Sequence, residues 1–360
     1  MRAKGIFVQV ASYRDPQLVP TLVDLIEQSS RPGALRIVVC WQHGDDETLE
    51  AFLDQGFVLE AGEDADVTGA WPVRRLGRAG AVVELIDVPR LRSRGVCWAR
   101  NLVQQRYEGE AYTLQLDSHH RFVSGWDDVA IGMLESLRGG SRKPALTTYL
   151  PAFDADNDPE GRVMLPSVLL FREFDADGIV LFAGRYVGES EYDHPIPGSF
   201  YSAHFCFADG SFATEVRHDP DLFFYGEEIS IAVRAYTHGY DFFYPHRLIA
   251  WHRYGCEGRV AIWQEHTEAA RTRGDIDVSW EEHNDRARAR VRRLLGVDGL
   301  RPTGMEATPY GFGRVRSLAG YEEQTGLCFA SRTARAGAGQ LPPPGAEFRA
   351  RSRAARAAAC

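Results

Sequence analysis

The first 117 residues alternate between apolar runs of strand length and helical segments, and this alternation restricts the fold more than any other feature. The apolar runs occupy residues 5–11, 35–41, 81–89 and 111–117. Helical patterns lie between them, over residues 16–30, 45–55 and 94–107. Strands that are almost continuously apolar and alternate with helices are typical of a parallel sheet covered on both faces. The sequence therefore predicts an α/β fold with a doubly wound, nucleotide-binding arrangement.

Local signals refine this first half. Asp15-Pro16 is a helix start, with Asp15 as the N-cap and Pro16 at the first helical position. Residues 61–80 contain Gly, Asp and Arg without a clear period. We therefore expect a loop there.

The chain changes character after Lys143-Pro144, where strands and helices no longer alternate regularly. Hairpins are expected around the turn at 175–178 and around Asp209-Gly210. The other expected elements are a helix over 226–240, short strands at 241–245 and 248–254, and a charged surface helix over 280–296. No linker separates the two halves, so this mixed α+β part continues the same domain.

The last 30 residues differ in composition from the rest. Residues 331–360 contain six Arg against one Glu, the segment LPPPG and an Ala-rich end. Because they have too little apolar surface to bury, we expect a disordered tail. Such a tail either binds an acidic partner or is simply solvated.

Composition excludes several classes of protein. The net charge of −9 gives no basis for a nucleic-acid-binding surface, which is normally basic. No apolar run approaches the roughly 20 residues that span a bilayer, and the N-terminal residues carry no signal-peptide pattern. The six Cys include no C-x-x-C pair, and several lie in apolar runs, so we expect free thiols in a reducing cytoplasm.

One carboxylate and one imidazole follow the fourth predicted strand. Asp117 and His119 are two residues apart, so in an extended chain they point to the same side. They lie at the carboxyl end of a parallel strand, where open α/β sheets bind ligands. Oxygen and imidazole ligands without thiolate favour Mn²⁺ or a similar divalent ion, which could hold a diphosphate. The alternative is an Asp that caps the next turn beside a merely polar His.

A third metal ligand has to come from elsewhere in the chain. His252 is the best placed of the 11 His, because it follows an apolar strand and precedes a polar turn. His204 lies inside the apolar run SAHFCFA, which is typical of a hydrogen-bonded core histidine. For both residues a core role remains the alternative.

Gly226, Glu227 and Glu228 form a second candidate group. Paired acids at a helix start commonly complement the helix dipole. The functional alternative is a carboxylate that faces a sugar hydroxyl or an acceptor.

Arg94 and Arg100, on the helix before the fourth strand, either bind phosphate or pair with acidic neighbours. No P-loop, G-x-G-x-x-G, G-x-S-x-G or H-E-x-x-H motif occurs, which removes the commonest other functions.

Eight stretches between about residues 5 and 255 form an ordered set: GIFVQVASYRDPQLVPTLVDLIEQ, VVCWQ, RGVCWAR, LQLDSHHRFVSGWDD, PALTTYLP, SAHFCFADGSF, FFYGEEISIAVRAYTHGYD and WHRY. This set resembles the polypeptide N-acetylglucosaminyltransferase family, with a weaker echo at residues 310–326. Eukaryotic members of that family modify a hydroxyproline of a ubiquitin-ligase adaptor in the cytoplasm, and the family has bacterial members. It is related to the mucin-type polypeptide N-acetylgalactosaminyltransferases, and both are assigned the GT-A fold with retaining chemistry.

The resemblance implies roles for individual residues. Asp117-Ser118-His119 would be the D-x-H counterpart of a D-x-D metal motif, and His252 the third protein ligand of Mn²⁺ or another divalent cation. Glu227 would orient the donor sugar, and Glu228 would help to position the acceptor. The residues expected to contact the UDP-sugar are Ala11, Ser12, Tyr13, Arg14, Arg94, Gly95, Arg100, Ser118 and Gly226. One departure is His120, where a hydrophobic residue is expected, but strand alternation points it away from the metal.

The implied fold is GT-A, a Rossmann-like nucleotide-binding half with a mixed α+β acceptor-side half, over residues 1–300. Residues 301–330 would form a lid or a C-terminal extension, and residues 331–360 the tail. The implied function is retaining transfer of N-acetylglucosamine from UDP-GlcNAc to a Thr, Ser or hydroxyproline hydroxyl of a peptide or protein. The alternatives are the same chemistry on a small molecule or glycan, a noncatalytic UDP-sugar-binding protein, and a Mn²⁺-dependent hydrolase of nucleotide sugars.

Overall fold

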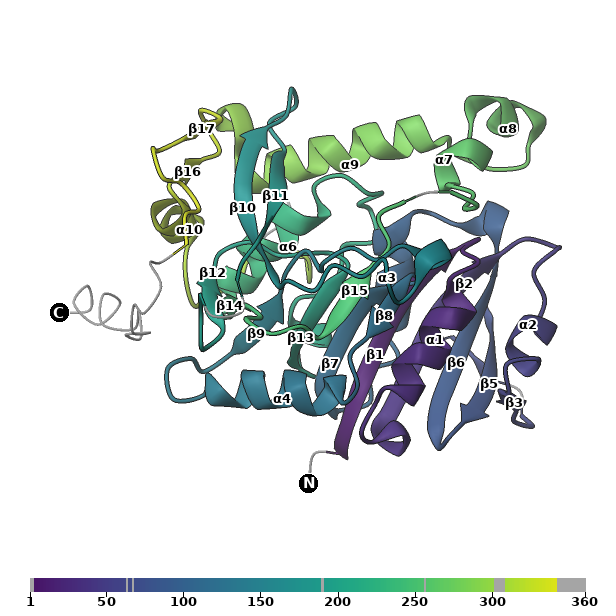
Figure 1. Ribbon diagram of the computed structural model, residues 1–360. Helices are drawn as coiled ribbons and strands as arrows, with labels where there is room; N and C mark the ends of the chain where they lie inside the picture. The colour runs from purple at the N-terminus through teal and green to yellow at the C-terminus, as the bar shows by residue number, and fades with distance from the viewer. Residues whose placement is uncertain are drawn as a thin grey trace.

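The computed structural model describes residues 3–62, 64–66, 68–188, 191–255, 257–300 and 308–341. Within them the chain forms an α/β fold around one large mixed sheet (Figure 1). The strand order of this sheet is β12-β14-β9-β13-β7-β1-β2-β6-β5-β3, with β4 paired to β5. The α/β class that the sequence predicts is confirmed. None of the helices in these residues is both long enough and apolar enough to cross a membrane.

The centre of the sheet is parallel and covered by helices on both faces. Its strands are β1 (Ala3–Tyr13), β2 (Leu35–His43), β6 (Ala81–Pro89) and β7 (Glu110–Asp117). Neighbouring residues of β1 face opposite sides. Val8 and Val10 therefore pack with α1 (Leu18–Glu27) and α4 (Trp126–Ser136), whereas Phe7 packs with α3 (Val96–Gln104). This is the parallel half that the apolar runs predict.

Antiparallel pairing begins beyond β7. The strands on this side are β13 (Phe205–Asp209), β9 (Pro144–Thr147), β14 (Asp241–Tyr244) and β12 (Ile196–Gly198). β13 runs antiparallel to both β7 and β9. Helices α6 (Glu227–Thr237) and α9 (Trp280–Leu295) share one apolar cluster with this half, which includes Ile229, Val233 and Val291. The second half is thus mixed, as expected.

A separate two-stranded sheet brings a distant segment to the end of β7. Its strands are β8 (His120–Phe122) and β15 (Ala250–His252), which run antiparallel with His252 opposite His120. After β15 the chain continues through α7 (Ile262–Glu265) and α8 (Glu268–Arg273) to α9.

The remaining elements are short or peripheral. They are α2 (Glu50–Leu53), β3 (Val58–Leu59), β4 (Asp64–Ala65), β5 (Pro72–Arg78), the hairpin of β10 (Ser167–Phe174) and β11 (Val180–Tyr186), α5 (Phe212–Glu215), α10 (Leu318–Thr325), β16 (Leu327–Cys328), β17 (Thr333–Ala334), and 3₁₀ helices at Pro32–Ala34, Arg90–Arg92, Ala155–Asn157 and Val297–Gly299.

The first half departs from the predictions in two places. Helix α1 begins at Leu18 rather than Pro16. One carboxylate oxygen of Asp15 accepts from the Gln17 backbone N–H, and the other accepts from the Ser118 hydroxyl at the end of β7. The loop expected at 61–80 contains β5, which pairs antiparallel with β6. Its buried residues, Val73 and Leu76, are three apart, so the alternation typical of a strand is absent from the sequence.

The predicted hairpin at Asp209-Gly210 is wrong. β13 ends at Asp209, and the chain then enters α5. The favoured two-residue hairpin turns need a positive φ, and Gly210 is not among the described glycines with positive φ. A Cβ on Gly210 would collide with the carbonyl oxygen of Glu110, so this glycine permits close packing against β7.

The C-terminal predictions meet the structure only in part. The helix expected on the surface, α9, buries one side through Ala287 and Val291. Residues 308–330 lie against α6, where the rings of Tyr236 and Tyr321 are 5.5 Å apart. Disorder is wrong for residues 331–341, which include β17 paired with β16. The rest of the predicted tail, 342–360, lies outside the described residues.

Candidate functional site

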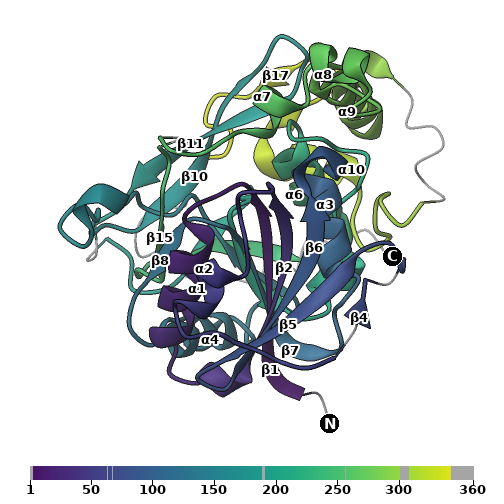
Figure 2. The same cartoon turned by 90° about the vertical axis from the view of Figure 1, so that its right-hand side faces the viewer.

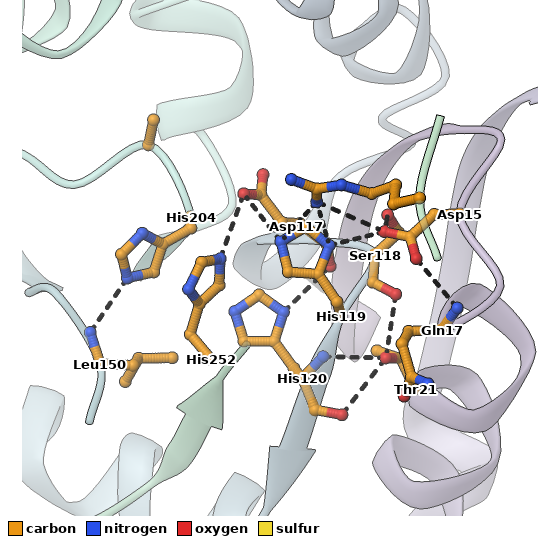
Figure 3. A network of polar contacts seen from close by, with 12 residues as sticks. Asp15, Gln17, Thr21, Asp117, Ser118, His119, His120, Leu150, His204 and His252 are labelled. Atoms are coloured by element: carbon orange, nitrogen blue, oxygen red, sulfur yellow. Dashed lines mark hydrogen bonds and ion pairs between the residues drawn. The ribbon is translucent and has the colours of Figure 1, made fainter. Parts of the chain in front are cut away.

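A pocket of about 540 Å³ opens at the carboxyl ends of β1 and β7, where the parallel part of the sheet gives way to the antiparallel part. Its lining comes from the ends of these strands, the starts of α3 and α6, and the segment after β15. Figure 3 shows the polar side chains that converge at one side of this pocket.

Asp117, His119 and His252 meet in this pocket. Each offers one ligand atom, and these atoms all lie within 4.8 Å of one another. Oδ2 of Asp117 is 3.5 Å from Nε2 of His252 and 3.8 Å from Nε2 of His119 (Figure 3). Asp117 ends β7, whereas His252 arrives through the pairing of β15 with β8. The group that the resemblance implies is therefore assembled from two segments far apart in the sequence.

The charge state of this group suits a divalent cation. Burial lowers the pKa of His252 to about 4, so at neutral pH its imidazole is neutral, the form that binds metals. Burial opposes ionisation of Asp117, but His252, Arg100 and His119 hold its pKa well below the usual range.

Hydrogen bonding at His252 also suits a cation. Nδ1 of this residue is buried without a hydrogen-bond partner among the described residues, and the buried Nε2 has only its 3.5 Å contact with Oδ2 of Asp117. A buried polar atom without a partner is costly, and a bound cation would satisfy one of these nitrogens. One carboxylate and two imidazoles are a donor set that accommodates Mn²⁺.

Asp15 holds His119 in place from the end of β1. Its Oδ2 lies 2.6 Å from Nδ1 of His119 and accepts a hydrogen bond of 2.7 Å from Oγ of Ser118. Fixing Nδ1 in this way leaves Nε2 facing Asp117, the arrangement in which a carboxylate orients a metal-binding imidazole. Arg259 adds a guanidinium, whose Nη1 is 3.1 Å from both ring nitrogens of His119 and 3.7 Å from Asp15.

Arg100 joins the metal group to the start of α6. Its buried guanidinium contacts Oδ1 of Asp117 at 2.5 Å and Oε1 of Glu227. Nε2 of His218 is also 2.8 Å from the same Glu227 oxygen. Of the two roles considered for Arg100, pairing with acidic neighbours is the one present here, and it fixes Glu227 beside the pocket.

Glu228 lies in a different environment from Glu227. Its carboxylate accepts hydrogen bonds from the Tyr149 hydroxyl at 2.6 Å and from the Ala203 backbone N–H at 2.9 Å. Burial raises the pKa of Glu228 to about 7, and no arginine among the described residues forms an ion pair with it. The two adjacent acids therefore differ in charge state near neutral pH. Gly226 precedes them with φ +85°, where a Cβ would come within 2.7 Å of Val291.

The residues expected to contact the UDP-sugar divide into two groups. Those that line the pocket are Ala11, Tyr13, Gly95, Arg100, Ser118 and Gly226. Ser12 is buried on β1, and Arg14 forms ion pairs with Asp46, Glu47 and Glu265. Arg94 is exposed in a separate cavity behind the segment that precedes α3. The structure thus gathers most of the predicted donor-side residues and places these three elsewhere.

Several site residues escape the sequence analysis. Asp15 is the clearest, because it follows the end of β1 by two residues and the sequence analysis considers it only as a helix cap. Tyr149 lies in one of the stretches that resemble the family but receives no role there, and His218 lies outside those stretches. Only the folded chain brings the two residues to Glu228 and Glu227. Such contacts depend on tertiary packing, which spacing in the sequence does not report.

Comparison with solved structures finds chains of similar arrangement at low sequence identity. The crystal structure of GalNAc-T7 with UDP, GalNAc and Mn²⁺ is 14% identical, with a TM-score of 0.49, and the match covers 89% of this chain. The structure of S. aureus TarS in complex with UDP-GlcNAc is 12% identical, with a TM-score of 0.41, covering 79% of this chain and 70% of that one. This chain spans about half, 54%, of the GalNAc-T7 chain.

Sequence comparison gives a more direct result. Among curated proteins, no sequence matches the chain significantly. The family model described as Glycosyltransferase (GlcNAc) matches residues 5–331, which is most of the chain. The protein therefore belongs to the GlcNAc glycosyltransferase family.

Proposed function

We propose that this protein transfers N-acetylglucosamine from UDP-GlcNAc to a hydroxyl of Thr, Ser or hydroxyproline in a peptide or protein, with retention of configuration. The observation that carries the proposal is the convergence of Asp117, His119 and His252 within 4.8 Å, in a pocket that Glu227 and Glu228 also line. The family description supplies the sugar, and the resemblance to polypeptide transferases supplies the acceptor class.

Asp117, His119 and His252 would hold Mn²⁺ or another divalent cation. Such an ion, when bound, neutralises charge on a diphosphate leaving group. Asp15 keeps His119 oriented for this role, and the depressed pKa of His252 keeps that ring neutral. The pocket thereby presents three preorganised ligand atoms, and His252 needs no deprotonation near neutral pH before the donor binds.

Glu227 and Arg100 act on the donor side. The Arg100 guanidinium restrains both Asp117 and Glu227, so the carboxylate that faces the donor sugar is held at a fixed place relative to the metal ligands. Gly95 and Ala11 leave room along the wall where α3 and β1 meet the pocket. These contacts orient the sugar and exclude alternative poses.

Glu228 and Tyr149 act on the acceptor side. Their hydrogen bond places a carboxyl group with a pKa near 7 in the pocket, where it can accept from or donate to an acceptor hydroxyl. In a front-face reaction the departing phosphate oxygen takes the proton of that hydroxyl, so Glu228 positions the acceptor rather than serving as an obligatory base. We place this reaction in a reducing cytoplasm, in keeping with the free Cys40, Cys97, Cys206 and Cys328.

The proposal is tested with purified protein, Mn²⁺, a panel of UDP-sugars and a library of Thr-, Ser- and hydroxyproline-containing peptides. We expect intact-mass analysis to show a gain of one N-acetylhexosamine on peptides with UDP-GlcNAc, and UDP release that peptides accelerate. The Asp117→Asn variant should lose both signals, whereas Asp128→Asn on the exposed side of α4 should keep them.

Other results would assign a different function. Fast UDP release that peptides do not affect indicates a hydrolase of nucleotide sugars. Transfer only to a small molecule or glycan retains the chemistry and replaces the acceptor class. UDP-sugar binding without any release indicates a noncatalytic binding protein.

A further inference from the structure

A second cavity lies next to the catalytic pocket. It has a volume of about 1280 Å³ and lies between α3 and α9, both of which can be followed in Figure 2. Ser93, in the segment before α3, lines both this cavity and the catalytic pocket. We call this cavity the α3/α9 groove. A ligand in it would lie one short segment away from the reacting groups.

The α3/α9 groove is basic although the protein is acidic. The whole chain has a net charge of −9. The groove is nevertheless lined by more arginines than acids, namely Arg92, Arg94, Arg286, Arg290 and Arg293 against Asp221 and Asp277. The three arginines of α9 are four and three residues apart and so lie along one side of the helix. Since the opposite side is buried through Ala287 and Val291, the basic side has to face outward into the groove.

Three of these arginines have no acidic partner in the part of the chain that the structure describes. Arg290 is paired with Asp219 at 2.6 Å, and Arg286 with Glu282. Arg92, Arg94 and Arg293 are exposed and form no ion pair or side-chain hydrogen bond with described residues. Unlike the paired surface arginines of this protein, these guanidiniums can bind an external carboxylate in a bidentate manner.

The base of the groove is aromatic. Trp98 on α3 is 8% exposed, and Trp71 packs edge-on against it at 6.2 Å with the rings at 85°. His283 on α9 stacks on Phe223, and burial together with Arg286, His266 and Arg94 lowers its pKa. The imidazole therefore adds no charge of its own near neutral pH. Aromatic residues together with arginine are the composition that protein interfaces favour.

We infer that the α3/α9 groove binds an acidic peptide segment, rich in Asp or Glu, of the protein that the enzyme glycosylates. The inference rests on the proposed protein acceptor and adds a docking contact outside the catalytic pocket. The groove volume exceeds the roughly 300–1,000 Å³ typical of small-molecule pockets, which suits an extended peptide. Clustered arginines are a recurring means of recognising acidic motifs.

Charge also favours an acidic peptide over two other candidate ligands of the groove, the C-terminal residues of this chain and a nucleic acid. The C-terminal residues 342–360 contain Arg349, Arg351, Arg353 and Arg356, so they would be repelled by the groove. A nucleic acid would be opposed by the net negative charge of the protein beyond the groove. A short acidic peptide avoids both obstacles.

The test measures direct binding, without any UDP-sugar. A fluorescent peptide of Glu, Trp and Ser is titrated with the full-length protein at low salt, and fluorescence anisotropy is recorded. A matched peptide with Gln in place of Glu and a labelled single-stranded oligonucleotide are the comparison probes. The groove variant carries Arg92→Glu, Arg94→Glu and Arg293→Glu, and the control variant carries the same change at three exposed arginines outside the groove, Arg142, Arg247 and Arg314.

We expect the Glu peptide to bind the wild-type protein and the control variant, and to bind the groove variant at least about tenfold more weakly. The Gln peptide should bind weakly to all three. Mn²⁺ titration of the groove variant should match the wild type, which verifies that the catalytic pocket is intact. The inference is overturned if the Glu peptide does not bind, if both variants lose binding equally, or if the oligonucleotide binds more tightly than the peptide.

This outcome is independent of the transfer assay. Peptide glycosylation without groove-dependent binding removes the docking inference and leaves the proposed function in place. Groove-dependent binding without transfer to any peptide retains a site for acidic peptides, but it contradicts the proposed acceptor class and the assignment of the bound protein as the acceptor.

Discussion

Oδ2 of Asp15 lies 2.6 Å from Nδ1 of His119, which links the end of β1 to the candidate metal ligands at the end of β7. Asp15 is itself buried, and the pKa of its carboxyl is lowered by His119 and Ser118 against the effect of burial. A charged carboxylate therefore stays in contact with the imidazole and keeps Nδ1 as the hydrogen-bonded nitrogen. The geometry assigns Asp15 a positioning role.

Replacing Asp15 should weaken metal binding without removing a ligand. In Asp15→Asn, the amide keeps the shape of the side chain but loses the charge that orients His119. Outer partners of this kind typically contribute about 10–100-fold to metal affinity, and we expect a loss in that range for Mn²⁺. Calorimetric titration of the variant checks this, with Asp128→Asn as the control. Unchanged Mn²⁺ affinity in Asp15→Asn would remove the positioning role.

Replacing His252 should have a larger effect than replacing Asp15. His252→Ala removes a ligand atom, whereas its stacked neighbour His204, at 4.1 Å between ring centroids, accepts from the Leu150 backbone N–H and does not belong to the ligand group. We expect Mn²⁺ affinity to fall further than in Asp15→Asn, and UDP release to fall by about 10²-fold or more, since a metal contributes several kcal/mol to such a reaction.

The half-buried His246 lies outside the pocket, so His246→Ala is the matched control for His252→Ala. Thermal melting of both variants separates a binding defect from unfolding. Equal Mn²⁺ affinities for His252→Ala and His246→Ala would contradict the assignment of His252 as a ligand.

The parallel half of the sheet was predictable because its strands are buried on both faces and so read as apolar runs. Asp117 and His119 were predictable for a related reason, since the end of such a strand is where ligands bind. β5 was not, because its buried residues Val73 and Leu76 do not alternate. Asp15 was mistaken for a cap because its carboxylate does accept from a backbone N–H, and only the folded chain shows its second oxygen reaching His119.

Arg14 and Arg94 illustrate a different limit. Both lie in stretches that resemble the family, yet each arginine has a long side chain whose direction depends on tertiary neighbours. Arg14 forms ion pairs with Asp46 and Glu265, and Arg94 lines the α3/α9 groove. A match in sequence places the backbone of such residues well, but it does not determine which cavity their guanidinium reaches.

Glu228 should make the free energy of unfolding decrease as the pH rises, which is the opposite of the usual effect of a carboxyl group. Its folded pKa of about 7 is above the ordinary value of 4.5, so the folded state binds the proton more tightly than the unfolded state does. The contribution of Glu228 is therefore fully present below about pH 4.5 and is lost as the pH rises through about 7. A shift of this size corresponds to a loss of about 3 kcal/mol at most.

Urea unfolding at about pH 5 and about pH 8 tests this effect. Glu228→Gln has no ionisable group at this position, so the free energy of unfolding of the wild type should fall relative to that of the variant between the two pH values. The same replacement at the exposed Glu281 is the control. A difference between wild type and Glu228→Gln that is the same at both pH values would show that the carboxyl does not titrate in this range.

Gly95 should tolerate no side chain, because two constraints meet there. Its φ is +102°, and a Cβ would lie 2.6 Å from the carbonyl oxygen of Phe223, which accepts a hydrogen bond from the Val96 N–H. Gly109 has nearly the same φ, +100°, but nothing lies within 4 Å of its Cβ position. Gly109→Ala should therefore cost only the conformational penalty of about 1–2 kcal/mol, whereas Gly95→Ala adds a steric clash to it.

A side chain at Gly95 should also disturb the geometry of the pocket. Relieving the clash requires movement between the start of α3 and the segment at Phe223, and α3 carries Arg100, whose guanidinium holds Asp117 and Glu227. We expect Gly95→Ala to lower the free energy of unfolding more than Gly109→Ala does, and to weaken UDP binding, which Gly109→Ala should leave unchanged. Urea unfolding and UDP titration of the two variants measure both effects. Equal destabilisation with equal UDP affinity would mean that the contact between Gly95 and Phe223 does not constrain the pocket.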